Sequence, residues 1–379
     1  QQGAGTGSGS GRSRTEVLPP RPGFEKQSEI INAVPTPDDI STDTETIATN
    51  VLLALALILL IGFPADIFNS TLAEHYDEIT GWFRFGRRRR DPGQVRRESW
   101  FDRLPTPLRL GAIGLIGSIL YGLLDPNFGF NRPSLILVLG LLLAIATISG
   151  VLDILRMHFH RRVTRKRSRL KAFPLGLVMA AILVFFSRVG DFHPGYVFGI
   201  FTALAFDDEL YDEEDGRGLA LAGVGLLVVA ITALLLRAPL DRLAGEDGAG
   251  FVLLVVDAAL ATLWIAGIQA VIWGLIPISF MYGQKVLAWS KVGWFAIYGT
   301  GMLLFVHTLL HPGMGLYGNA AEASLFSVTM LFLCFGAFSL LFWGYFRFRK
   351  PRRPKFEPVA GDRTLMAEGS VSRFDRTEF

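Results

Sequence analysis

The chain has 379 residues, 50% of them hydrophobic, and its 37 Lys and Arg against 34 Asp and Glu give a formal net charge of +3. The apolar residues come in long uninterrupted runs instead of the spacing of a soluble core, which excludes a purely soluble protein and predicts a polytopic helical membrane protein. The single cysteine, Cys334, excludes a disulfide framework and a thiolate metal cluster.

Residues 1–47 are expected to form a disordered linker outside the membrane. Their first part, QQGAGTGSGSGRSRTEVLPPRPG, is rich in Gly, Ser and Pro and has no apolar run that it could bury. The chain begins at Gln1 without a basic and apolar leader, so we expect a fragment or a processed chain that has lost a signal peptide, with or without an upstream domain.

Eight apolar runs are predicted to cross the membrane as α-helices, because ~20 residues at 1.5 Å rise span the hydrocarbon core. In chain order they cover 48–66, 107–124, 134–155, 172–187, 218–236, 250–276, 293–310 and 324–346. The predicted fold class is therefore an all-α membrane bundle over 48–346, with a disordered tail at each end. The second tail, 347–379, is basic where it leaves the last run and should be cytoplasmic.

Basic residues in the connections determine the predicted orientation. The loops 67–107 and 156–171 hold eight Lys or Arg each, and the tail begins RFRKPRRPK, so all three are expected on the cytoplasmic side. The residues expected to contact anionic lipid headgroups are Arg87, Arg88, Arg89, Arg90, Arg165, Lys166 and Arg167. A positive flank without any recognition role explains the same residues, and nucleic-acid binding is not expected beside a membrane.

The orientation rule calls for one more crossing. Eight crossings from an outside N-terminus leave the basic tail outside, whereas a ninth brings it inside. Segment 194–206, PGYVFGIFTALAF, is apolar, but as a helix it would cover only roughly 20 Å of a ~30 Å core. We expect it to form a short or tilted helical crossing, with a re-entrant hairpin as the alternative.

The loop 67–107 also carries an apolar stripe at helical spacing. Leu72, His75, Ile79, Trp82 and Phe83 follow one another at intervals of three, four, three and one residues, directly ahead of the arginine run. This pattern predicts an amphipathic helix that lies in the membrane interface.

Ionisable residues within the runs are the first candidates for function. Asp257 lies some seven residues into its run, roughly 10 Å deep, where a charge costs ~2.5–3.5 kcal/mol unless it is paired or faces water. We expect either a proton or ion path through Asp257 or a structural Asp–Arg pair. Gln269 lies about three turns further along, and Arg188, Asp191 and His193 surround the turn before segment 194–206.

A metal site is the third kind of site considered. His307 and His311 have the spacing of the two ligands in a His-Glu-x-x-His helix, but Thr308 stands where the catalytic Glu would be. Both imidazoles also lie near the end of a run, where they can reach the interface. We therefore expect no metal, no cofactor and no catalytic residue.

The segment that begins at Leu275 resembles the third motif of site-2-type membrane peptidases. In that motif an Asp-Gly pair follows a Leu-Pro turn and supplies a metal ligand. Here Pro277 is followed by Tyr282-Gly283, so the ligand is missing, and the His pair lies downstream instead of upstream. This resemblance therefore implies no peptidase activity.

The same stretch resembles a family of actinobacterial integral membrane proteins named for a Phe-Gly-Leu-Leu-Pro motif. Here the motif reads Trp273, Gly274, Leu275, Ile276, Pro277, and Gly283 follows it. The resemblance implies a multi-pass protein, often with an extracellular immunoglobulin-like part, and brings no established activity. Gly274 and Pro277 are also expected to end the helix at headgroup level, with the surrounding aromatic residues as a belt.

Two functions follow as hypotheses. The first is a non-enzymatic anchor or scaffold of the bacterial cell envelope, which links an extracytoplasmic module to the cytoplasmic membrane, with or without a further link to a cytoplasmic assembly. The second is a transporter or proton-coupled protein that uses Asp257 and segment 194–206. The expected partners are anionic lipids, proteins of unknown identity and further copies of the chain in a homo-oligomer.

Overall fold

The computed structural model describes residues 27–76, 78–79, 104–164, 168–172, 175–190, 202–206, 212–245, 249–279, 281–310 and 318–349. The arginines at 87–90, the basic residues 165–167, Asp191, His193 and His311 lie outside these ranges, as does the tail after 349. The predictions made for those residues therefore stay predictions.

A long helix occupies each of the eight predicted runs. These helices are α2 (Thr44–Glu74), α4 (Thr106–Gly122), α5 (Arg132–Phe159), α6 (Leu175–Val189), α7 (Asp212–Ala244), α8 (Phe251–Gly274), α10 (Lys291–Leu309) and α11 (Gly318–Phe348). Six of them are long and apolar enough to cross a membrane, which supports the predicted class of multi-pass membrane protein. The other two, α4 and α6, have only 17 and 15 residues.

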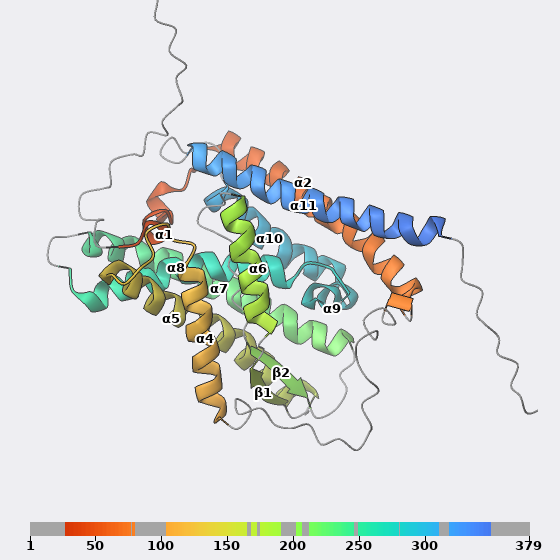
Figure 1. Cartoon of the computed structure of the whole chain (residues 1–379), viewed down its shortest axis with the longest axis horizontal. Helices are drawn as coiled ribbons and strands as arrows, with labels where there is room; N and C mark the ends of the chain where they lie inside the picture. Colours follow the sequence, from red (N-terminus) through yellow and green to blue (C-terminus); the bar gives the residue numbers. More distant parts are fainter. Residues whose placement is uncertain are drawn as a thin grey trace, which may run out of the picture.

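Helix α8 is the centre of the bundle. In its most apolar stretch 61% of the residues are buried, against 22% in α11, which lies at the edge. Helices α5 and α7 pack along α8, and α10 packs on the α7–α8 pair (Figure 1). Helix α5 approaches α8 closely at Gly140, which has no side chain. A Cβ added to Gly140 would lie only 2.8 Å from the Cβ of Ala258.

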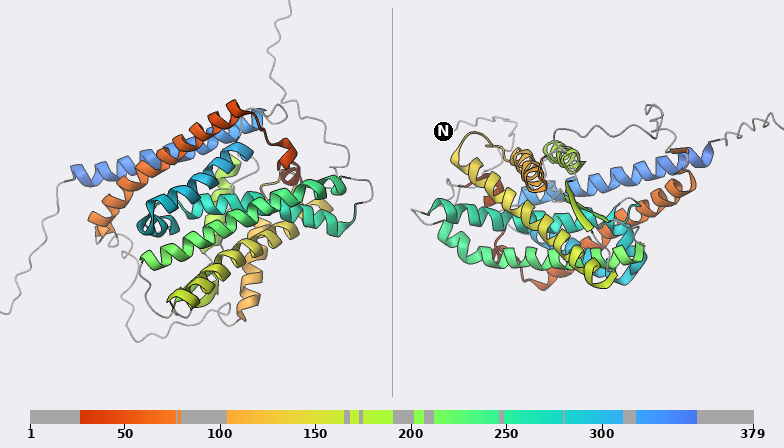
Figure 2. Two further views of the ribbon diagram at one scale, coloured as in Figure 1. Left: turned by 180° about the vertical axis from the view of Figure 1, so that it is seen from behind. Right: turned by 90° about the horizontal axis from the view of Figure 1, so that it is seen from below.

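The remaining helices cover this core from two sides. Helices α2 and α11 run side by side along one edge, and α4 and α6 cross one face of the core at a steep angle (Figure 2). Large apolar side chains on α11 are exposed, among them Phe338 and Leu341. Such an exposed apolar belt suits contact with lipid.

Helix α2 is longer than predicted and corrects the boundary of the loop 67–107. It continues through Pro64 as far as Glu74 because its second half packs against α11. Phe68 contacts three phenylalanine rings of α11, and His75 stacks on Phe346 with 4.3 Å between ring centroids. His75, one residue of the stripe expected to lie in the membrane interface, therefore packs on another helix.

The expected disordered linker 1–47 is wrong for residues 27–47. Residues 27–43, which we name the strap, include the helical turn α1 (Glu29–Asn32) and the 3₁₀ turn η2 (Pro37–Asp39). Asp39 accepts hydrogen bonds from the N–H and hydroxyl of Thr36 at 2.9 and 2.8 Å. Composition indicated disorder because the strap has few apolar residues, but the bundle supplies the surface that buries them.

Asp43 joins the strap to α2. Its carboxylate accepts a hydrogen bond from the N–H of Thr46 (3.0 Å), and this main-chain bond lowers the pKa of Asp43 below its usual value. The carboxylate therefore caps the first turn of the helix, where a negative charge is favourable.

The described residues form a helical bundle, as predicted, to which one small two-stranded sheet is added. Strands β1 (Ser168–Ala172) and β2 (Thr202–Phe206) are antiparallel, with Ser168 opposite Phe206 and Ala172 opposite Thr202. The helix predicted over 194–206 is therefore wrong for its last five residues. Aromatic and β-branched residues favour an extended chain, and β1 provides partners for the main-chain groups.

The helix ends form two groups, which we name after the short elements that they carry. At the α1 end, Arg188 at the end of α6 donates to the carbonyl of Leu123 after α4 (2.9 Å). His307, near the end of α10, contacts the carbonyl of Ser41 in the strap (3.0 Å). The ends of α4, α6 and α10 and the start of α2 therefore lie together.

The opposite end carries helix α9 (Tyr282–Trp289) and is named the α9 end. Here Arg156 near the end of α5 and Lys285 of α9 both contact Asp215 at the start of α7, at 2.7 and 2.9 Å. The side chain of Asn69, near the end of α2, donates to the carbonyl of Pro277 after α8 (2.7 Å). Helices α2, α5 and α8 therefore run from the α1 end to the α9 end, whereas α4, α6, α7 and α10 run from the α9 end to the α1 end.

Candidate functional site

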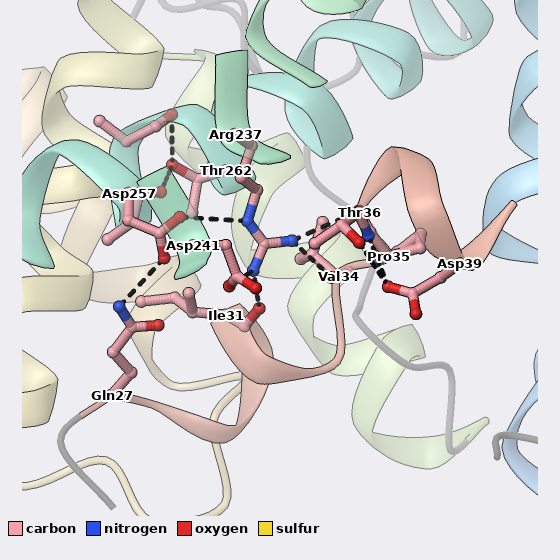
Figure 3. Close-up of polar contacts among 12 residues, drawn as sticks. Gln27, Ile31, Val34, Pro35, Thr36, Asp39, Arg237, Asp241, Asp257 and Thr262 are labelled. Atoms are coloured by element: carbon pink, nitrogen blue, oxygen red, sulfur yellow. Dashed lines mark hydrogen bonds and ion pairs between the residues drawn. The ribbon is translucent and has the colours of Figure 1, made fainter. Parts of the chain in front are cut away.

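Asp257, the strongest candidate from the sequence, is completely buried near the α1 end. Its Oδ1 accepts a hydrogen bond from Nε of Arg237 (3.3 Å), and its Oδ2 accepts one from the amide of Gln27 (3.0 Å; Figure 3). Of the two expectations, the geometry matches the structural Asp–Arg pair, because both carboxylate oxygens are bound to protein groups. The pair offsets the cost of a buried charge.

Arg237, in α7, is 1% exposed and provides the cation of this site. Its guanidinium also lies 3.4 Å from Asp241, one turn further along α7. Its other donors bond main-chain carbonyls of the strap: Ile31 at 2.9 Å, Pro35 at 3.4 Å and Val34. One side chain therefore links α7, α8 and the strap, as Figure 3 shows.

A second carboxylate holds the strap from α4. Asp125, just after α4, is buried and its Oδ2 accepts a hydrogen bond from the N–H of Ile30 (3.3 Å). Gln27, Ser28, Ile31 and Val34 are buried as well. The strap is therefore packed against the bundle by apolar contacts and fixed in register by three charged side chains, Arg237, Asp257 and Asp125.

His307 holds the end of the strap that leads into α2. Its Nε2 lies 3.0 Å from the carbonyl of Ser41, and its Nδ1 lies 2.8 Å from the amide nitrogen of Asn50 in α2. The two ring nitrogens thus join the strap to the first half of α2. The histidine chosen as a metal candidate has a structural contact instead, and the described residues contain no group of three or more potential metal ligands.

The other polar candidates have separate positions. Arg188 lies at the α1 end, where it also contacts the carbonyl of Asp125 (3.3 Å). Gln269 is buried in α8, three turns from Asp257. Of these candidate polar residues, Asp257 is the one that the structure shows bonded to Arg237.

The second buried charge cluster, at the α9 end, was not predicted. Asp215 is bound by Arg156 and Lys285 and lies 3.6 Å from Nε2 of the fully buried His160. Arg156 also lies over the ring of Tyr282, 5.3 Å from its centroid, and burial raises the pKa of the Tyr282 phenol. The cluster joins α5, α7 and α9 and holds this end of the bundle together.

The turn that carries the five-residue motif is packed against α2. Helix α8 ends at Gly274, Pro277 lies in the turn, and Trp273 is within the last turn of the helix. Asn69 accepts hydrogen bonds from the N–H and hydroxyl of Ser279 at 2.8 and 2.7 Å. The predicted helix stop is thus present, and Asn69 satisfies main-chain groups that the break releases.

Comparison of the chain with protein-family models, with curated proteins and with solved structures gives no match. The resemblances carried by Trp273, Gly274, Pro277 and Gly283 therefore stay predictions.

The partner of Asp257 follows from its position only once the helix ends are known. Arg237 and Asp257 are each ten residues from residue 247, in the connection between the end of α7 at Ala244 and the start of α8 at Phe251, whereas the predicted run 218–236 stops one residue before Arg237. Antiparallel helices bring such residues to the same depth. Gln27 and Asp125 have no comparable signal because their contacts depend on how the strap folds back.

Proposed function

We propose that the chain is a non-enzymatic membrane anchor or scaffold of the bacterial cell envelope. Its bundle would hold the N-terminal side of the chain at the extracytoplasmic face and expose basic connections at the cytoplasmic face. The observation that carries this proposal is that the buried charged side chains bind the strap to the bundle. Arg237, Asp257 and Asp125 all bind the strap, so these costly groups attach one segment of the chain to the bundle.

The same observation disfavours the transporter hypothesis. A carboxylate that carries protons or ions must meet water or a substrate along a path. Asp257 is 0% exposed, and Gln27 and Arg237 engage its two oxygens. The final part of segment 194–206 is a strand, so a half-helix like those of transport sites is not found there.

The proposal includes nine crossings with the N-terminus outside. Strand β2 pairs with β1, and Asp215 at the start of α7 contacts Arg156 at the end of α5. Both contacts show that the chain after α6 is back at the α9 end, where α6 begins. Residues 190–206 therefore make a return crossing in this proposal, and the α9 end faces the cytoplasm with the basic loops.

The nine-crossing topology predicts which cysteines react from outside the cell. In a Cys334→Ser background, Thr42→Cys and Asn127→Cys should react with an impermeant maleimide in intact cells. Arg217→Cys and Lys291→Cys should react only after permeabilisation. If residues 190–206 did not cross, the last two would react in intact cells, which would contradict the topology.

The anchor role predicts protein contacts at both ends of the bundle. A photo-crosslinking amino acid at Thr42 and another at Lys291, both exposed, should give discrete protein adducts in native membranes. The matched control is Leu333, exposed on α11, where adducts to lipid are expected. The proposal would be wrong if neither polar position gave an adduct while Asp257→Asn abolished a proton or ion flux in proteoliposomes.

Lipid headgroups at the basic loops, a homo-oligomer and membership of the family named for Phe-Gly-Leu-Leu-Pro are parts of the same proposal. A multi-pass anchor fits each of them. None is needed for the contacts that attach the strap.

A further inference from the structure

Most of the polar contacts between the strap and the bundle use main-chain groups of the strap, and its side chains Gln27, Glu29 and Asp38 make the others. Arg237 binds the carbonyls of Ile31, Val34 and Pro35, and Asp125 binds the N–H of Ile30. Carbonyl and N–H groups are present in every peptide, so these contacts recognise a conformation and tolerate a change of sequence. Peptide-binding proteins commonly divide recognition in this way, with affinity from the main chain and selectivity from pockets.

Selectivity comes from apolar side chains of the strap. Ile31 and Val34, three residues apart, are 0% and 3% exposed. Ile30 covers a small apolar pocket, whose other lining residues are Tyr121, Leu124, Leu137, Leu141, Thr262 and Ile265. A ligand of this groove therefore needs a helical turn with two apolar residues at positions i and i+3.

The groove is built without help from the strap. Arg237 contacts Asp257 and Asp241, all of which belong to α7 and α8, and Asp125 follows α4. Helices α4, α7 and α8 are held to the rest of the bundle by their own packing. The charged groups would therefore remain in place after the strap had left.

The strap, in contrast, has little structure of its own. Helix α1 has four residues, whereas isolated helices shorter than ~12–15 residues are marginal in water. Its helical turn therefore depends on the groove, as in a peptide that folds when it binds.

We propose that the groove formed by α4, α5, α7 and α8 is a peptide-binding site, and that residues 27–36 are its intramolecular ligand. The strap docks and undocks as one unit, and a peptide with the same main-chain and apolar features binds the groove when the strap is displaced. This inference does not depend on the anchor role, because the strap leads directly into α2 and stays joined to the bundle through that helix when it undocks.

The docking equilibrium is tested first, in the full chain. In a Cys334→Ser background, Val34→Cys should react with a maleimide at least about tenfold more slowly than the exposed reference Thr42→Cys. Adding Ile31→Asp, which puts a charge at a buried position of the strap, should raise the rate at Val34→Cys at least about tenfold. Equal rates at the two cysteines without Ile31→Asp would overturn the proposal.

Binding in trans is tested next, with a fluorescent peptide of residues 27–43 and the full-length Ile31→Asp protein in detergent. Saturable binding is expected, and it should weaken at least about tenfold when Arg237→Gln is added, since a tenfold change corresponds to the loss of one net hydrogen bond of ~1.4 kcal/mol. Arg217→Gln is the matched control, because Arg217 is exposed at the other end of the same helix.

A peptide-side control remains usable if Arg237→Gln does not fold. The peptide carrying Ile31→Asp should not bind the Ile31→Asp protein, whose bundle is unchanged. The proposal is overturned if the unmodified peptide shows no saturable binding, or if both peptides bind equally. Neither result would alter the crosslinking test of the anchor role, so failures of the two proposals can be distinguished.

Discussion

Replacement of Arg237 by Met is expected to lower the free energy of unfolding by about 3–5 kcal/mol, the usual cost of removing one partner of a buried ion pair. Asp257 would be left without its cation at a fully buried position, while the amide of Gln27 still donates to its Oδ2. The carbonyls of Ile31, Val34 and Pro35 would lose their donor as well. A neutral side chain of similar length fills the space but replaces none of these bonds.

Thermal unfolding of the detergent-solubilised protein measures this effect, and Arg242→Met is the matched control. Arg242 lies five residues further along α7, its side chain is 72% exposed, and its ion pair with Asp38 is on the surface. An exposed pair contributes only about 0.2–1 kcal/mol, so the control should be nearly neutral. Equal midpoints for the two variants would show that the buried pair does not stabilise the bundle.

A double variant separates the charge from the other contacts of Arg237. Asp257→Asn removes the charge that Arg237→Met leaves behind, so the double variant should be more stable than the sum of the two single effects predicts. The recovery should be incomplete, because the strap carbonyls still lack a donor. Strict additivity would mean that the two side chains are not coupled.

The sequence predicts the membrane helices well because the signal for each is local. A run such as 250–276 has nearly continuous apolar residues, and helix α8 falls within it. The run 48–66 also predicts a helix, but not its extension to Glu74, because that part of α2 depends on Phe68 packing against α11. Boundaries that depend on a distant helix have no local signal.

The candidate site could be predicted only in part. Asp257 can be selected as a candidate from the sequence, since a carboxylate within an apolar run is costly to bury and therefore indicates a specific role. The strap is not evident, because its composition resembles that of a linker and its order comes from contacts with Arg237 and Asp125, more than 90 residues away in sequence. The strand Thr202–Phe206 was missed for the same reason, since its partner β1 lies beyond α6.

Replacement of Gly283 by Ala is the second substitution expected to have a large effect. A Cβ at this position would lie 2.1 Å from the carbonyl oxygen of Leu275 and 2.4 Å from that of Ile276. Both oxygens belong to the main chain, so no side chain can rotate away, and α9 must shift from the end of α8. Overpacking of this kind costs about 1–3 kcal/mol or more.

The shift would also disturb the contact between α9 and α7. Gly216 of α7 packs so closely on α9 that a Cβ there would lie 2.3 Å from the carbonyl oxygen of Lys285. The ion pair between Lys285 and Asp215 spans the same contact at 2.9 Å. Gly283→Ala should therefore weaken the Asp215 cluster, and Lys285→Met should destabilise the Gly283→Ala protein less than it destabilises the unmodified protein.

Gly62→Ala is the control, because no heavy atom lies within 4 Å of a Cβ at Gly62 and the residue is inside α2. Ala is favoured over Gly in a helix by roughly 0.5–1 kcal/mol, so this variant should be as stable as the unmodified protein or slightly more so. Thermal unfolding of both variants in the same detergent makes the comparison. If Gly283→Ala unfolded at the same temperature as Gly62→Ala, the main chain at Gly283 would have space for a side chain. A glycine at position 283 would then need a reason other than close packing, such as contact with a partner.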